Sequence, residues 1–179
     1  MIKLVILDRD GVINQDSPKY IRSPDEWHAI PGSMEAIARL KSCGYQVAIA
    51  TNQSGVARGY FTLETLDAIH KKMLDEIQKA GGEIACIFVC PHHPDDNCDC
   101  RKPLPGLLLQ AANKFHVDPS EMVMIGDSMR DVLAAKNCGA QSIFVKTGYK
   151  EKDPVEAQKN GVPIYKDLAE AVDAVCSKT

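Results

Sequence analysis

Two aspartates separated by one residue directly follow an apolar stretch near the start of the chain. Leu4-Val5-Ile6-Leu7 leads into Asp8-Arg9-Asp10-Gly11. An unbroken apolar run is typical of a strand buried on both faces of a parallel sheet, and such sheets bind ligands beyond the carboxyl ends of their strands. Residues two apart in a strand face the same side, so both carboxylates can point at one site. Gly11 permits the chain to turn away sharply.

Three more strand-like stretches also end in polar residues, namely Thr51-Asn52, Arg101-Lys102 and Gly126-Asp127. A lone Asp-x-Asp after a strand is most simply a solvated loop. The combination of acids, a hydroxyl and a lysine instead matches the needs of Mg²⁺-assisted phosphoryl transfer. A divalent cation removes the repulsion between a phosphate and a carboxylate nucleophile, and donors such as Thr51 and Lys102 stabilise charge on the transferred group.

Two further charged residues have open roles. Asp131 lies one helical turn beyond Asp127 and could hold Lys102, or it could be a solvated acid that the helix dipole favours. Arg58 belongs to the site or lies on an exposed loop.

The elements that must position these residues alternate between strand and helix. The pattern predicts further strands at 45–51, 84–90, 122–125, 142–146 and 163–165. It predicts helices that begin near the caps Ser33 and Thr62, after Pro105, after 126–131 and at Asp167. The long helix after Thr62 carries an apolar stripe with His70 beside it, which indicates core packing. We therefore expect an α/β fold with a doubly wound, mostly parallel sheet flanked by helices.

Length and composition indicate a single domain over residues 1–179 with a minimal cap, because no segment is long enough for a second domain. Any cover over the site must come from loops 15–32 and 52–61.

The hydrophobic content is 45% and the charged content 25%, which is ordinary for a globular protein. A net charge of -3 argues against nucleic-acid binding. With no apolar run of membrane-spanning length and no signal-peptide pattern, we expect a cytoplasmic monomer without a membrane partner.

The chain has 7 cysteines, an odd number, so a disulfide framework is not expected. Cys43, Cys86, Cys138 and Cys176 lie in or beside apolar runs and are interpreted as small core residues.

The other three cysteines lie in a loop at 90–100. The pairs Cys90-x-His92 and Cys98-x-Cys100 fit a closed tetrahedral Zn²⁺ site with three thiolates and one imidazole. A redox-active thiol cluster is the alternative, and His93 is the competing imidazole. Since four protein ligands leave no open position, the zinc would be structural. The loop returns at Cys100 directly before Arg101 and Lys102, so the metal would fix these two cations in place.

In order along the chain, Asp8-Arg9-Asp10-Gly11, Thr51, Lys102 and Gly126-Asp127 with Asp131 resemble the four motifs of the haloacid dehalogenase superfamily of phosphatases. The resemblance covers nearly the whole chain. It implies that Asp8 is the nucleophile that forms a phospho-aspartyl intermediate and that Asp10 is the general acid and base. It also implies that Asp8, the backbone carbonyl of Asp10, and Asp127 bind Mg²⁺.

The residues of the predicted zinc loop limit the resemblance to one subgroup of this superfamily. Cys-x-His followed by Cys-x-Cys-Arg-Lys-Pro is characteristic of the D-glycero-D-manno-heptose-1,7-bisphosphate 7-phosphatases and the related histidinol-phosphate phosphatases. The stretches 8–14 and 51–59 are similar to the heptose enzymes, which act in nucleotide-activated heptose and lipopolysaccharide biosynthesis. The resemblance implies removal of the C7 phosphate of a sugar bisphosphate. It implies substrate contacts from Asp16, Ser17, Pro18, Lys19, Thr51, Asn52, Gln53, Ser54, Arg101 and Lys102.

Two alternatives remain open at this point. A histidinol-phosphate phosphatase has a substrate with a cationic side chain, for which a cationic rim would be wrong. A receiver-like phosphoacceptor also uses Asp, Thr, Lys and Mg²⁺, but such a domain lacks an acid two residues beyond the accepting aspartate.

Overall fold

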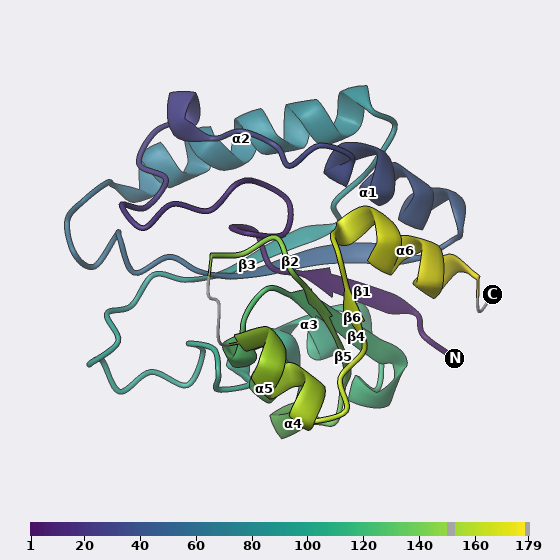
Figure 1. The fold of residues 1–179 in the computed structure, drawn as a ribbon. Helices are drawn as coiled ribbons and strands as arrows, with labels where there is room; N and C mark the ends of the chain where they lie inside the picture. Colours follow the sequence, from purple (N-terminus) through teal and green to yellow (C-terminus); the bar gives the residue numbers. More distant parts are fainter. Residues whose placement is uncertain (150–152, 178–179) are drawn as a thin grey trace.

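A parallel sheet runs through the centre of the protein, between layers of helices (Figure 1). The structure is a computed structural model that describes residues 1–149 and 153–177. The sheet has 6 strands in the order β3-β2-β1-β4-β5-β6, and each strand pairs in parallel with its neighbours. The strands are β1 (Leu4–Leu7), β2 (Gln46–Asn52), β3 (Cys86–Cys90), β4 (Met122–Gly126), β5 (Gln141–Val145) and β6 (Ile164–Tyr165). The predicted fold class is confirmed.

Helices cover both faces of this sheet (Figure 1). One layer contains α1 (Ser33–Ser42), α2 (Leu63–Lys79) and α6 (Leu168–Cys176); the other contains α3 (Gly106–Phe115), α4 (Met129–Cys138) and α5 (Asp153–Lys159). In β1, Val5 and Leu7 pack into the first layer while Leu4 and Ile6 pack into the second, and all are 0% exposed. Burial on both faces explains the uninterrupted apolar run. Among the described residues, no helix is long and apolar enough to cross a bilayer.

Most predicted helix starts are confirmed, one differs, and one helix was not predicted. Thr62 caps α2 by accepting a hydrogen bond from Thr65 N, as expected. Ser33 is not a cap: the cap position of α1 is Gly32, with φ 85°. The Ser33 hydroxyl instead bonds the backbone carbonyls of Ile13 and Ile30 at 2.7 Å each. Helix α5 was not anticipated, because its short sequence carries no clear amphipathic period.

The cysteine interpretation requires one correction. Cys43, which caps the end of α1, and Cys176, the last residue of α6, form a disulfide with a Cα–Cα distance of 6.1 Å. The two residues are 133 positions apart, so no local pattern could have paired them. They meet because α1 and α6 lie side by side on the same face of the sheet. Cys86 and Cys138, interpreted as core residues, are free thiols that are half-buried and pack against the core.

Candidate active site and metal centres

A cavity of about 190 Å³ lies at the carboxyl edge of the sheet, where β1, β2 and β4 end. Loops 15–32 and 52–61 both contribute to its lining, as expected for the cover. The predicted residues in the lining are Asp8, Asp10, Asp16, Ser17, Pro18, Thr51, Asn52, Gln53, Ser54, Arg101, Lys102 and Asp127. Lys19, also predicted as a substrate contact, is exposed and does not line this cavity. The sheet therefore brings nearly all of the predicted site together.

Lys102 is the central cation of the site, although it is only 2% exposed. Its Nζ contacts the carboxylates of Asp131 at 2.6 Å and Asp8 at 3.0 Å, and it donates to the carbonyl of Ala50 at 2.7 Å. The interpretation that Asp131 holds Lys102 is thus confirmed. Both neighbouring carboxylates raise the pKa of Lys102 against the opposing effect of burial, so the ammonium stays charged.

The carboxylates around Lys102 fit a divalent cation. Oxygens of Asp8, Asp127 and Asp131 lie within 4.8 Å of one another. Burial raises the pKa of Asp8 to about 7, and burial with the nearby Asp8 raises that of Asp127 to about 8, because one lysine cannot neutralise three crowded acids. Asp131 already bonds Lys102 through one oxygen and Ser128 through the other. Asp8 and Asp127 are therefore the side chains suited to hold Mg²⁺, a hard cation that prefers oxygen ligands.

Two glycines leave room for the Asp127 carboxylate to pack closely against the loops that follow β1 and β5. Gly11 has φ +82°, and a Cβ built on it would collide with the Asp127 carboxylate. A Cβ on Gly148, from the loop after β5, would collide with the same carboxylate. Gly148 was not recognised in the sequence, since a requirement for close approach leaves no local pattern.

The Asp10 carboxylate is held by four donors. Arg9 Nε and Asn14 Nδ2 donate to Oδ1 at 3.0 and 2.9 Å, while Arg9 Nη2 and Gln53 Nε2 donate to Oδ2 at 2.9 Å each. Burial raises the pKa of Asp10, but the Arg9 guanidinium and the amide hydrogen bonds outweigh it and lower the pKa below its usual value. Sequence reasoning did not anticipate these partners. Arg9, between the two aspartates, was the available signal in the sequence, but the direction of its side chain depends on tertiary packing.

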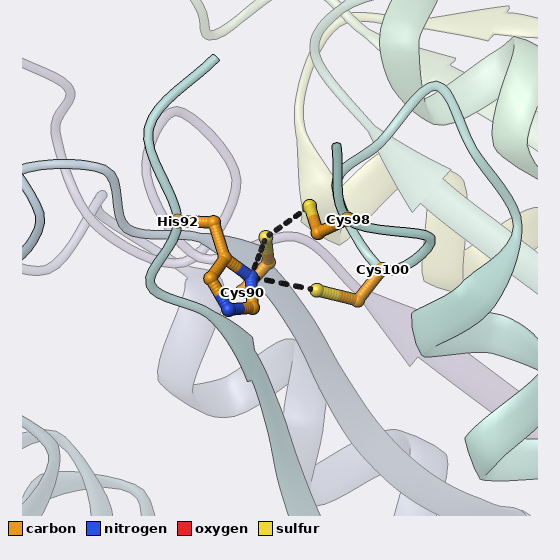
Figure 2. A group of neighbouring side chains, drawn as sticks. All are labelled: Cys90, His92, Cys98 and Cys100. Carbon is orange, nitrogen blue, oxygen red and sulfur yellow. Dashed lines mark hydrogen bonds between the residues drawn. The ribbon is translucent and has the colours of Figure 1, made fainter. Parts of the chain in front are cut away.

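The four predicted zinc ligands converge on one point, as Figure 2 shows. Their ligand atoms lie within 4.8 Å of one another; the sulfurs of Cys90 and Cys98 are 3.8 Å apart, and His92 Nδ1 is 3.2 Å from the sulfur of Cys100. Tetrahedral Zn–S bonds of about 2.3 Å imply sulfur separations of about 3.8 Å, so this donor set fits zinc. His93 is not part of the cluster, and its ring instead contacts Asp95.

A second cationic group also contributes to the lining of the cavity. Arg58, Arg101 and Arg130 all line it, and Arg130 was not anticipated by sequence reasoning. Burial and the proximity of Arg130 lower the pKa of Arg101. Among the described residues, Arg101 Nη1 and Arg130 Nε are buried nitrogens without a hydrogen-bond partner. Buried donors are normally paired, so this arrangement is suited to an anionic group of a ligand.

Comparison with known proteins identifies the family. The D-glycero-beta-D-manno-heptose-1,7-bisphosphate 7-phosphatase of Pseudomonas aeruginosa is 48% identical over 172 residues, covering 96% of this chain and 97% of the relative. The crystal structure of a D,D-heptose 1,7-bisphosphate phosphatase from Bordetella bronchiseptica, complexed with magnesium and phosphate, superposes with a TM-score of 0.95. It is 46% identical and covers 99% of this chain and 100% of that one.

The chain belongs to this phosphatase family. The corresponding enzyme from Burkholderia thailandensis, also a solved structure, gives a TM-score of 0.72 at 37% identity over 98% of this chain and 99% of that one. A family model described as HAD-hydrolase-like matches residues 99–171. The protein is therefore a phosphoric monoester hydrolase of the haloacid dehalogenase type, as the motifs indicated. The magnesium in the Bordetella structure agrees with the carboxylate cluster of Asp8 and Asp127.

Proposed function

We propose that this protein removes the C7 phosphate of D-glycero-D-manno-heptose 1,7-bisphosphate in nucleotide-activated heptose biosynthesis. The relatives named above carry this activity in their names, and those names specify the beta anomer. The observation that carries the proposal for this chain is the presence of further cations beside Lys102 in one cavity. Lys102 lies beside Asp8, and the same cavity is lined by Arg101 and Arg130, each with a buried nitrogen that has no hydrogen-bond partner among the described residues. A bisphosphate has one phosphate for each group.

In the first step, an Asp8 oxygen attacks the C7 phosphorus and the bond from phosphorus to the C7 oxygen breaks. That oxygen receives a proton from Asp10, which must take the proton up from solvent in the substrate complex because the pKa of the free carboxyl is lowered. Heptose 1-phosphate leaves and a phospho-aspartyl group remains. Asp10 then takes a proton from water, which attacks phosphorus and releases phosphate and free Asp8. Lys102 and the Thr51 hydroxyl donate to the phosphoryl oxygens throughout. Bound Mg²⁺ would be held by Asp8, Asp127 and the Asp10 carbonyl, and it supplies positive charge that offsets the repulsion between carboxylate and phosphate.

The two arginines that line the cavity set the orientation of the substrate. Guanidinium groups bind phosphate through paired hydrogen bonds, so Arg101 and Arg130 suit the phosphate that stays at C1. This arrangement places C7 at Asp8 and explains why one phosphate leaves while the other is retained. Histidinol phosphate would bring a cationic group toward these arginines, which disfavours it as the substrate.

The test is a panel of substrates assayed with Mg²⁺. Both anomers of heptose 1,7-bisphosphate, histidinol phosphate and p-nitrophenyl phosphate would be compared by kcat/KM, and the product would be identified by its remaining ³¹P signal. We expect the beta bisphosphate to be the best substrate and heptose 1-phosphate to be the product. A preference for histidinol phosphate would overturn the assignment, and a stable phospho-aspartate without phosphate release would indicate a receiver-like phosphoacceptor.

We further propose that residues 1–179 act as one phosphatase domain, as a monomer in the cytoplasm. One sheet contains every strand of the described residues, and the cavity is lined by residues at the strand ends and in the loops that connect them.

A further inference from the structure

His70 contacts the catalytic machinery through a buried arginine. It lies on α2 and is 7% exposed, so its predicted place in the core is confirmed. Its Nε2 atom lies 3.2 Å from Nη1 of Arg9, a residue 61 positions earlier in the chain. Arg9 is 0% exposed and sits between the two aspartates of the first motif. The histidine therefore has a contact that core packing alone does not require.

The chemistry of the pair fixes the state of the imidazole. A guanidinium has five N–H donors and no acceptor, so His70 Nε2 must be the acceptor in this hydrogen bond. The ring is then neutral and carries its proton on Nδ1. Burial and the Arg9 charge both lower the pKa of His70, to about 4, which agrees with this assignment.

The same guanidinium positions Asp10. Arg9 Nε and Nη2 bind the two oxygens of Asp10 at 3.0 and 2.9 Å, while Nη1 is directed to His70. Because the guanidinium is planar and rigid, an anchor on Nη1 also fixes the orientation of the other two nitrogens. Without this anchor, the Arg9 guanidinium could rotate about the bonds of its side chain. The orientation of the Asp10 carboxylate would then no longer be fixed.

We propose that His70 is a positioning residue that holds Arg9 and thereby aligns the Asp10 carboxylate for proton transfer to the leaving oxygen. The inference rests on the proposed role of Asp10 as general acid. Misplacement of a catalytic group by about 1 Å is sufficient to slow a reaction roughly a hundredfold. If a residue acts through the general acid, its loss should slow a substrate whose leaving group needs a proton more than a substrate whose leaving group does not.

The experiment compares His70→Leu, which removes the acceptor, with His70→Gln, whose amide oxygen can still accept from Arg9. Two substrates are assayed: heptose 1,7-bisphosphate, which loses an alkoxide, and p-nitrophenyl phosphate, whose leaving group needs no proton. His70→Leu should lower kcat/KM for the bisphosphate roughly ten- to a hundredfold and for the aryl phosphate less than about threefold. His70→Gln should recover most of the loss, and Ile69→Val, a neighbouring buried change on α2, serves as the matched control.

A double-mutant cycle separates positioning from general structural damage. In an Asp10→Asn background, His70→Leu should cause no further loss on the bisphosphate, since the group it aligns is already gone. Equal losses on both substrates, or full additivity with Asp10→Asn, would overturn the proposal. If Asp10→Asn itself keeps full activity, the proposed role of Asp10 fails instead. Should His70→Leu not fold, His70→Met carries the same expectations.

Discussion

The side-chain amide of Asn52 forms two hydrogen bonds with the backbone of Lys102. Its Nδ2 donates to the Lys102 carbonyl and its Oδ1 accepts from the Lys102 N–H, both at 3.0 Å. Asn52 is the last residue of β2, and Lys102 follows the zinc loop, so the amide continues the pairing of the sheet where no strand is available. The backbone that carries the central cation is thereby fixed to the strand that carries Thr51.

Asn52→Ala should therefore slow catalysis by displacing Lys102. Two part-buried backbone groups would lose their partners, which costs about 1–3 kcal/mol each when a group stays unpaired. We expect kcat to fall roughly tenfold, and Asn52→Asp to be worse because its carboxylate would face the Lys102 carbonyl. Asn137→Ala is the control, since Asn137 also donates to a backbone carbonyl, that of Pro103, outside the cavity. Equal kinetics for Asn52→Ala and Asn137→Ala would contradict the expectation.

Changes to the two motif aspartates should separate their roles. Asp8→Asn should abolish turnover, because no neighbouring group replaces its attack on phosphorus. Asp10→Asn should lower kcat by roughly 10²–10⁴, the usual contribution of a positioned acid–base group. Steady-state kinetics measure both effects, and circular dichroism checks that the fold is retained. A fully active Asp10→Asn enzyme would show that another group handles the proton.

Removal of zinc should loosen the loop that leads to Lys102. Cys98→Ser should lower the Tm and reduce activity, and elemental analysis of the unchanged protein should find about one zinc per chain. Cys86→Ser is the matched control, because Cys86 is a half-buried free thiol outside the cluster. Zinc-free protein with unchanged melting and turnover would exclude a structural role for the metal.

Loss of Arg101 or Arg130 should lower kcat/KM for the bisphosphate more than for a substrate with one phosphate. Arg101→Ala and Arg130→Ala should each reduce kcat/KM for heptose 1,7-bisphosphate roughly ten- to a hundredfold, the effect of losing a charge-assisted hydrogen bond of about 1.5–3 kcal/mol. Turnover of p-nitrophenyl phosphate, which lacks a second phosphate, should barely change. Lys136→Ala removes an exposed charge from the same helix as Arg130 and should have no effect. Equal losses on both substrates would mean that the arginines support the chemical step.

The buried neutral His70 should make stability depend on pH in a defined window. The pKa of His70 is 6.5 when unperturbed and about 4 in the folded protein, so between these values the unfolded chain binds more protons. The free energy of unfolding should thus fall as pH drops from 6.5 to 4, by up to about 1.4 kcal/mol per pH unit, with no contribution above 6.5. Urea unfolding of the unchanged protein and of His70→Gln, over this range, should show a shallower slope for the variant. Parallel slopes would mean that His70 is protonated in the folded state.

The sequence alone was sufficient for the fold class, the order of the motifs and the members of the Cys/His cluster. These features are local: an apolar run predicts β1, periodicity predicts the longer helices, and the close spacing of Cys90, His92, Cys98 and Cys100 brings four possible ligands together. The carboxylates of Asp8 and Asp10 could be placed at the sheet edge because the ends of parallel strands share one edge.

Only the tertiary structure decided how distant side chains meet. The disulfide of Cys43 with Cys176, the contact of Arg9 with His70 and the place of Arg130 beside Arg101 all join segments whose relative position depends on helix packing. A side chain's direction is set by the packing around it, and a hydrogen bond over 61 residues leaves no periodic trace in the sequence. The sequence therefore determined which chemistry is present, and packing determined which residues hold each catalytic group in place.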